Sequence, residues 1–199
     1  MRSRPDVLIY VEDPGAANCV ASLPGELAAT GRSSSLLAGG HALAYLRGLG
    51  SSPAAIGPGA SASEILDRAR PRAVVVGTAE DPDTIGLALL DAARVRSIPT
   101  AAVLDSHTNL SRRFRGRSDD ALAHPPDVFL VPDEATRRGL VALGISAGRI
   151  RLCGHPHFDR LRRVRAELEA EGRPAVSARV LPLQAAGRPV FLIAADLSR

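Results

Sequence analysis

Two adjacent carboxylates, Glu12 and Asp13, stand in the stretch VEDPGAAN (residues 11–18), directly after the strand-like run DVLIY. Pro14 suits the first turn of a following helix, and Gly15 lets another group approach the backbone closely. The N–H groups at the start of a helix attract anions, but two carboxylates repel them. This turn therefore favours a hydroxyl-bearing or cationic ligand, or a carboxylate that acts as a general base. One acid can cap the helix while the other stays free; Asp13 is favoured as the cap, and the reverse stays open.

Polar and small residues also follow the other predicted strands. In open α/β sheets, ligands bind in the crevice beyond the carboxyl ends of the strands. Taken singly, each of these loops is explained at least as well by ordinary turn and capping chemistry. Together they predict one ligand site, whose candidate residues outside the first turn are Asn18, Gly40, His41, Thr78, Asp105, Ser106, His107, Thr108, Asn109 and His155.

Several familiar site chemistries are not predicted. Asp105, Ser106 and His107 have the residue types of a hydrolase triad, but neighbours on one loop do not give its geometry, and the sequence has no GxSxG. His155 and His157 are spaced as two ligands on one extended segment, yet no third ligand lies nearby in the sequence, so we expect no metal site. The first turn has no GxGxxG, which disfavours ordinary NAD binding, and we expect no cofactor.

Seven short runs rich in β-branched residues or leucine predict β-strands, and helical patterns separate them. Several runs are apolar at consecutive positions, which suits strands covered on both faces, as in a parallel sheet. The alternation predicts an α/β fold with a Rossmann-like, doubly wound parallel sheet of about seven strands. The expected strands are 6–11, 35–39, 53–57, 73–78, 100–105, 127–133 and 149–154.

Local signals place several helix ends. Ser61 and Glu64 form a capping-box pattern, and Asp133 can cap the helix that follows it. Residues 84–97 predict a helix that is apolar almost all round. Pro24 is expected to kink the first helix of the chain.

The chain is expected to hold one domain and the start of another. Residues 1–157 are predicted to form the Rossmann-like domain, and residues 158–188 a charged helix and an interdomain linker. Arginines and glutamates four positions apart in that helix are typical of a solvated face. Residues 189–199 contain a buried-type strand, interpreted as the first strand of a truncated second domain. The alternative is a strand at the edge of the first sheet.

Composition narrows the expected partners and compartment. All 25 basic residues are arginine and the net charge is only +4, so nucleic acid is not an expected partner. Cys19 and Cys153 lie far apart without a CxxC motif, which is typical of a reduced cytoplasmic protein. Acidic residues lie too close to the N-terminus for a signal peptide. No apolar run approaches the roughly 20 residues of a membrane span. Abundant Ala, Gly, Pro and Arg indicate a GC-rich bacterial genome.

Four stretches beside the predicted strand ends resemble a family of bacterial glycosyltransferases in the GT-B superfamily. They are VEDPGAAN, VLDSHTNLSRRF, VPDEAT and LCGHPHFDRL. That superfamily also holds the UDP-N-acetylglucosamine 2-epimerases and the MurG-type transferases. The resemblance covers residues 5–199 and implies two Rossmann-like domains facing a cleft, of which this chain would supply the N-terminal, acceptor-side domain.

The resemblance implies transfer of a sugar from a nucleotide-sugar, expected to be UDP-linked, to a hydroxyl acceptor in polysaccharide or glycoconjugate assembly. Asp13 or Glu12 would deprotonate that hydroxyl, and His107 is the second choice because its ordinary pKa lies near neutrality. The expected partners are a sugar or glycolipid acceptor and a missing C-terminal domain or partner chain. The acceptor pocket would be shaped by Asn18, Gly40, His41, Thr108 and Asn109.

Two other functions stay open. Half of a GT-B enzyme can be a non-catalytic sugar-binding or scaffolding module, and an exposed edge of its last strand would allow a homodimer. A 2-epimerase-like enzyme is disfavoured, because the histidine–valine–glutamate–alanine–glycine stretch of those enzymes matches residues 103–107 here, which keep only the acid Asp105. The first loop also departs from the glycine-rich loop of MurG-like enzymes, which leaves the acceptor open.

The polar segment 111–126 ends in prolines and predicts a long loop. It places Arg112, Arg113 and Arg115 beside Phe114. These residues can make peripheral contact with a membrane surface, and a solvated loop explains them equally well.

Overall fold

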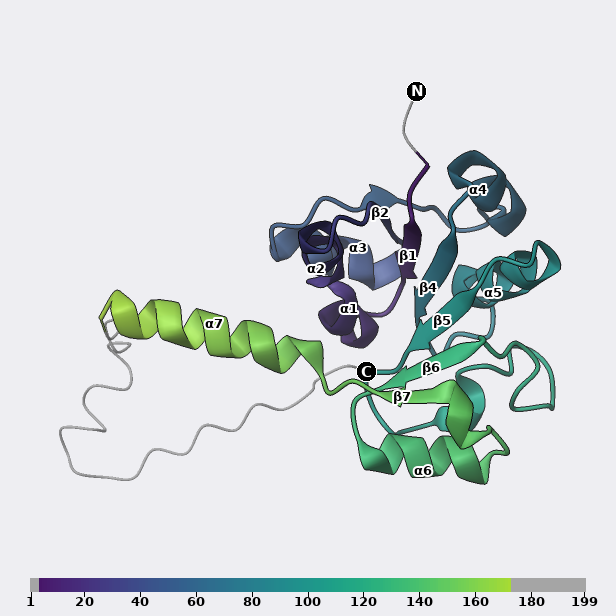
Figure 1. Cartoon of the computed structure of the whole chain (residues 1–199). Helices are drawn as coiled ribbons and strands as arrows, with labels where there is room; N and C mark the ends of the chain where they lie inside the picture. Colours follow the sequence, from purple (N-terminus) through teal and green to yellow (C-terminus); the bar gives the residue numbers. More distant parts are fainter. Residues whose placement is uncertain (1–3, 173–199) are drawn as a thin grey trace. The chain divides into compact units, whose positions relative to one another are not determined.

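The computed structural model describes residues 4–172 of the 199-residue chain (Figure 1). Residues 4–160 form one compact unit, and residues 161–172 belong to a second one. The segment 158–188, predicted to be a charged helix and a linker, begins in a helix as expected. Its part after residue 172 lies outside the described residues. The predicted strand of residues 189–199 also lies outside them.

The first unit is built on a seven-stranded sheet in which every neighbouring pair of strands is parallel, as predicted. The strand order is β3-β2-β1-β4-β5-β6-β7, so the order reverses between β1 and β4. All seven predicted strands are confirmed, although β3 pairs over two residues only. Their bounds are β1 Val7–Val11, β2 Ser34–Ala38, β3 Ala54–Ala55, β4 Ala73–Gly77, β5 Thr100–Val103, β6 Val128–Val131 and β7 Ile150–Leu152.

Helices cover both faces of the sheet, which explains the consecutive apolar residues in its strands (Figure 1). In β1, Leu8 and Tyr10 belong to one buried cluster, while Ile9 and Val11 belong to another. All four are fully buried. The helices are α1 Pro14–Val20, α2 Leu23–Ala29, α3 Gly40–Gly48, α4 Ala62–Ala69, α5 Ile85–Val95, α6 Glu134–Ala142 and α7 Pro156–Ala170.

Capping side chains start the helices as the sequence predicts. The side chain of Ser61 accepts a hydrogen bond from the backbone N–H of Glu64 at the start of α4. Asp133 caps α6 by accepting from the backbone N–H of Thr136 at 2.7 Å. The expected kink in the first helix is a complete break: α1 ends at Val20, and Pro24 lies in the first turn of α2, where a proline costs no backbone hydrogen bond.

The segment between β5 and β6 is irregular, as predicted, with one short 3-10 helix, η1 Leu110–Arg112. It is not a loop in solvent throughout. Phe114 is fully buried and packs edge-on against Phe129 of β6, with ring centroids 5.1 Å apart. Arg113 is also buried. The membrane-contact prediction is therefore wrong for these two side chains, because Phe114 fills the core and Arg113 points inward with it. Among residues 4–172, no helix is long and apolar enough to cross a membrane.

Candidate functional site at the carboxyl edge of the sheet

The loops that follow β1, β4 and β5 meet at one edge of the sheet, because parallel strands end on the same side. These three strands are neighbours in the order β1-β4-β5, beside the point where the strand order reverses. In open α/β sheets that point is the usual position of a ligand crevice.

The first loop uses its two carboxylates differently. Asp13 caps α1: its Oδ2 accepts hydrogen bonds from the backbone N–H groups of Gly15 at 2.8 Å and Ala16 at 3.3 Å. The prediction that Asp13 is the cap is confirmed. The prediction that Glu12 then stays free is wrong. Its Oε2 accepts hydrogen bonds from Tyr10 at 3.0 Å and Thr84 at 2.6 Å.

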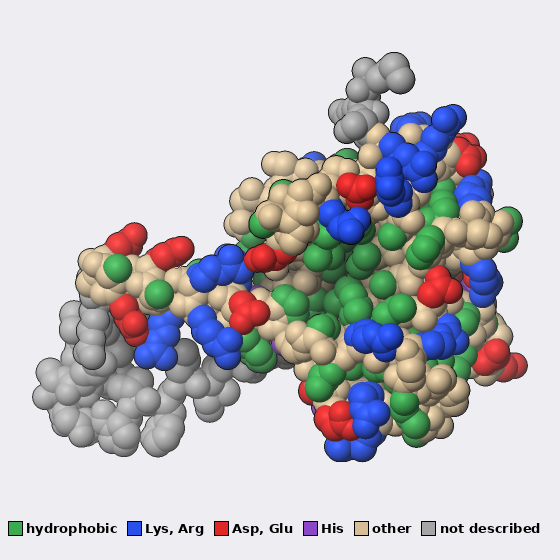
Figure 2. Space-filling model, viewed as in Figure 1, with side chains coloured by type: hydrophobic (Ala, Val, Ile, Leu, Met, Phe, Trp, Pro, Cys, Tyr) green, Lys and Arg blue, Asp and Glu red, His purple; other side chains and the backbone are tan. Residues whose placement is uncertain are grey.

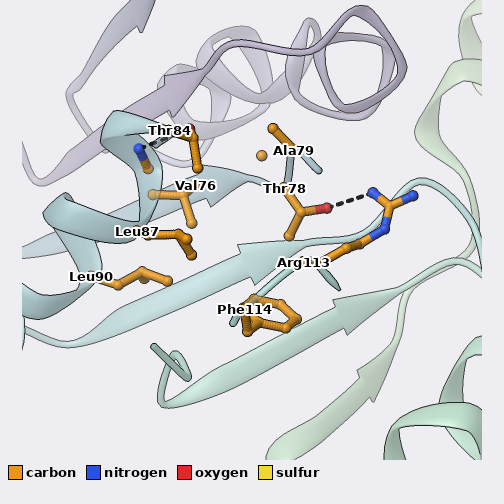
Figure 3. Close-up of a pocket in the computed structure, with 10 residues that line it drawn as sticks. Val76, Thr78, Ala79, Thr84, Leu87, Leu90, Arg113 and Phe114 are labelled. Atoms are coloured by element: carbon orange, nitrogen blue, oxygen red, sulfur yellow. Dashed lines mark hydrogen bonds between the residues drawn. The ribbon is translucent and has the colours of Figure 1, made fainter. Parts of the chain in front are cut away.

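Tyr10 and Thr84 are neighbours of Glu12 that were not predicted from the sequence. Burial raises the pKa of Tyr10, and the charge of Glu12 raises it further, so the phenol stays a hydrogen-bond donor. Thr84 caps α5 by accepting from the backbone N–H of Gly86 (Figure 3). Its hydroxyl also donates to Glu12. Gly40 faces Glu12 from the start of α3, and its φ of +46° suits glycine. The carboxylate of Glu12 is thus held by two hydroxyl donors, and the start of α3 packs closely against its side chain.

The loop after β5 brings a third carboxylate to the same place. A β-carbon at Gly15 would collide with Oδ2 of Asp105 and would lie 2.9 Å from Oδ2 of Asp13. The carboxylates of Asp13 and Asp105 therefore flank the same glycine, although they are far apart in the sequence. This contact explains why glycine follows Pro14: any side chain there would displace both acids.

A buried guanidinium supports this third carboxylate. Nη1 of Arg113 donates to Oδ1 of Asp105 at 2.8 Å. It also donates to the hydroxyl of Thr78 at 2.9 Å (Figure 3). Its Nη2 donates to the hydroxyl of Ser106 at 3.2 Å, and its Nε to the backbone carbonyl of Thr108 at 3.2 Å. The side chain of Arg113 is only 5% exposed. The guanidinium of Arg113 is therefore hydrogen-bonded to oxygen atoms of the protein itself.

One feature of the sequence could have predicted the burial of Arg113. The chain has only four phenylalanines and no tryptophan, so a phenylalanine inside a polar segment is a strong candidate for a core anchor. Phe114 is such an anchor, and its chain neighbour Arg113 enters the interior with it.

The remaining residues of the β5 loop lie nearer the surface. Asn109 donates from Nδ2 to both carboxylate oxygens of Glu80, at 2.8 and 3.0 Å. The hydroxyls of Ser106 and Thr108 lie 2.8 Å apart. His107 is exposed. The loop thus presents polar groups to solvent while Asn109 ties it to the loop after β4.

Three further predicted site residues lie toward α1, α3 and α7. Asn18 of α1 accepts a hydrogen bond from the hydroxyl of Tyr45 at 2.5 Å, so its carbonyl oxygen joins α1 to α3. His41 is exposed in the first turn of α3. Nε2 of His155 lies 3.7 Å from Sγ of Cys19. Burial, and to a lesser degree the charge of Asp105, raises the pKa of Cys19 to about 12, so this thiol stays protonated at neutral pH.

Two kinds of site do not fit the described residues. Across residues 4–172, no group of three or more His, Cys, Asp or Glu side chains is arranged to hold a metal ion. The gap drawn in Figure 3, which lies beside Thr78, Thr84, Arg113 and Phe114, has a volume of about 10 Å³. That is room for one water molecule at most, so no ligand the size of a sugar fits in this gap.

This architecture is similar to that of several solved structures. No family model matches the chain, and no curated protein matches it. Solved structures do match. UDP-GlcNAc 2-epimerase from Neisseria meningitidis bound to UDP-GlcNAc aligns with 90% of this chain at 16% identity and a TM-score of 0.60. S. aureus MnaA in a co-structure with UDP aligns with 90% at 12% identity and 0.64. UDP-GlcNAc 2-epimerase from Methanocaldococcus jannaschii aligns with 82% at 18% identity and 0.57.

The fold is that of a GT-B-like N-terminal half. The chain spans about half the length of each of these structures, between 51% and 52%. The expected GT-B-like fold is therefore confirmed, and at these identities the likeness concerns the fold alone. In this GT-B-like unit the site residues stand on the loops at the carboxyl ends of β1, β4 and β5.

Proposed function

We propose that this GT-B-like unit binds sugar hydroxyl groups on the acceptor side of a glycosyltransferase whose nucleotide-sugar is held by a second domain or a partner chain. The observation that carries this proposal is the meeting of Asp13 and Asp105 at Gly15. Carboxylates accept hydrogen bonds from hydroxyl groups and repel phosphate. The edge therefore suits a neutral polyol better than a diphosphate.

The contacts of Arg113 support the same ligand class. A phosphate-binding arginine presents its planar fork to the ligand. Here the fork donates to Asp105, Thr78 and Ser106. The guanidinium thus holds Asp105 in place and is not presented to a diphosphate. The diphosphate of a nucleotide-sugar would have to be bound by groups outside this cluster.

Asp13 is the proposed general base. Its Oδ2 is held by two backbone N–H groups, and among residues 4–172 no hydrogen bond reaches its Oδ1. In the proposed step, Oδ1 takes the proton of the acceptor hydroxyl. The hydroxyl oxygen attacks the anomeric carbon of the donor sugar, and the bond from that carbon to the diphosphate breaks. Glu12 is a poorer choice, because two O–H donors already occupy its Oε2, and His107 remains the alternative base.

A second candidate function is a 2-epimerase-like reaction on a UDP-sugar. The specific observation in its favour is that UDP-GlcNAc 2-epimerases are among the solved structures with this fold. In that case Asp105, which keeps the acid of the matching epimerase stretch, would act on the donor sugar itself. A non-catalytic sugar-binding module would need the same carboxylates but no base.

Calorimetric titration of the 199-residue chain with saccharides, with UDP and with UDP-GlcNAc tests the proposal. We expect saccharides to bind and UDP to release no heat. Asp13→Asn keeps the cap but removes the base and its charge, so it should weaken saccharide binding. Asp119→Asn, an exposed aspartate outside the site, is the matched control. Binding of UDP alone would overturn the acceptor-side assignment, and inversion at C2 of UDP-GlcNAc would establish the epimerase alternative instead.

A further inference from the structure

Helix α7, taken by itself, carries an apolar stripe that no part of the described chain buries. None of its residues is buried. Leu161 is 44% exposed and Leu168 is 43% exposed. Together with Val164 they recur at intervals of three and four residues, which places them along one side of the helix. Phe158, 58% exposed, borders the stripe. Large apolar side chains aligned in this way mark a surface that another helix can cover.

The spacing of the stripe is that of a helix-pairing seam. In heptad terms Leu161 and Leu168 occupy equivalent positions, and Val164 lies between them, as the a, d and a residues of a coiled coil do. Arg160 and Glu167 each precede one of these leucines, so both occupy g positions on the same side of the seam. The charges of these two residues can therefore determine which helix binds to the stripe, and in which direction.

Those charges fit a second copy of the same helix in the opposite direction. Arginines gather toward the start of α7 and glutamates toward its end (Figure 2). In an antiparallel pair, g positions face g positions, so Arg160 of each copy meets Glu167 of the other. In a parallel pair, g faces e, and Arg160 would meet Arg165 of the second copy. Opposite charges attract in the first arrangement and like charges repel in the second.

We propose that α7 pairs antiparallel with α7 of a second copy of this chain, through the stripe of Leu161, Val164 and Leu168. The two-fold symmetry of such a pair makes each charged contact twice. Within the helix, Arg165 pairs with Glu169 at 2.8 Å, and among residues 4–172 no salt bridge engages Arg160 or Glu167. Three apolar residues per helix bury less than the 1,200–2,000 Å², roughly, of a stable interface, so the dimer should be weak and concentration-dependent.

Sedimentation velocity of the 199-residue chain, from micromolar to millimolar concentration, tests this proposal. We expect a monomer–dimer equilibrium. Leu161→Ser with Leu168→Ser should weaken dimerisation about tenfold or more, because the apolar seam is lost. Val95→Ser, which changes a residue of α5 that is 82% exposed, is the matched control and should leave the equilibrium unchanged. Circular dichroism checks that every variant is folded.

Charge reversal distinguishes the antiparallel arrangement from other kinds of association. Arg160→Glu or Glu167→Arg alone should weaken the dimer, and the two together should restore it. A chain that stays monomeric at every concentration overturns the proposal, and so does a dimer that ignores the leucine substitutions. If the Leu161 and Leu168 side chains are shielded from solvent in a monomer, the same chain covers the stripe. That result also overturns the proposal. None of these results bears on saccharide binding at Asp13.

Discussion

Arg113 and Asp105 form an ion pair 2.8 Å long, in which the side chain of the arginine is 5% exposed and that of the aspartate 19%. The pair joins the β5 loop to the segment that follows it, and Thr78 adds a contact from the loop after β4. Because Asp105 also touches the glycine of the first loop, this one guanidinium sets the position of a carboxylate at the proposed ligand site. The stability of the loops and the shape of the site are therefore linked.

Removing the guanidinium should destabilise the fold strongly. Arg113→Met leaves the carboxylate of Asp105 without its cation, and breaking a buried pair in this way costs about 3–5 kcal/mol. The free energy of unfolding in urea measures the loss. Arg115→Met, which changes an exposed arginine two residues away, should alter it by no more than about 0.5 kcal/mol. Equal losses in the two variants would contradict the buried role of Arg113.

We predict that replacing Gly15 by alanine destabilises the protein, which is unusual for a glycine in a helix. Alanine normally stabilises a helix relative to glycine by about 0.5–1 kcal/mol. Gly25→Ala, in α2, should show this gain, because a β-carbon there meets nothing within 4 Å. Gly15→Ala should instead lose about 1–3 kcal/mol, because its β-carbon collides with Asp105. Thermal unfolding of the two variants compares them, and a stabilised Gly15→Ala protein would show that the acids do not meet there.

Much of this arrangement was predictable from the sequence, because local pattern determines it. The seven apolar runs became seven parallel strands, and Asp13, Ser61 and Asp133 became helix caps, since a cap involves neighbours in the chain. The contacts that hold the site were not predictable. Glu12 and its donor Thr84 are 72 positions apart, and no local pattern links them. The same applies to the entry of Arg113 into the core, which depends on where Phe114 finds a partner.

Stability in acid should depend on Asp133. The backbone N–H of Thr136 is the main cause that holds the pKa of Asp133 below its ordinary value, and the hydroxyl of Thr136 and nearby His107 add to it. The folded state thus favours the ionised form, and this contribution is present above the unfolded pKa, about 3.9. It is lost as the pH falls through the lower, folded pKa.

Asp133→Asn isolates that contribution, because asparagine can still cap α6 but does not ionise. Urea unfolding at pH 5 and at pH 3 should show the wild-type protein losing more stability in acid than the variant. The two proteins should converge as the pH falls. A constant difference between them at the two pH values would contradict the ionic role of Asp133.

The two cysteines should differ in reactivity. Burial raises the pKa of Cys19 to about 12, which leaves little thiolate at mildly alkaline pH, and the side chain itself is buried. Cys153 is exposed. Brief treatment with iodoacetamide followed by peptide mass spectrometry should find alkylation at Cys153 before Cys19. In urea both should react at similar rates; faster alkylation of Cys19 in the native protein would contradict its burial.

Amide NMR titration of the 199-residue chain tests most directly whether the first loop and the β5 loop bind a sugar. We predict that a saccharide shifts the amide signals of Gly15, Ala16 and Asp105, that Asp13→Asn weakens these shifts, and that Asp119→Asn leaves them unchanged. UDP should leave the same signals in place. Shifts of these amides by UDP, or saccharide shifts that persist undiminished in Asp13→Asn, would contradict a hydroxyl-binding site built on Asp13 and Asp105.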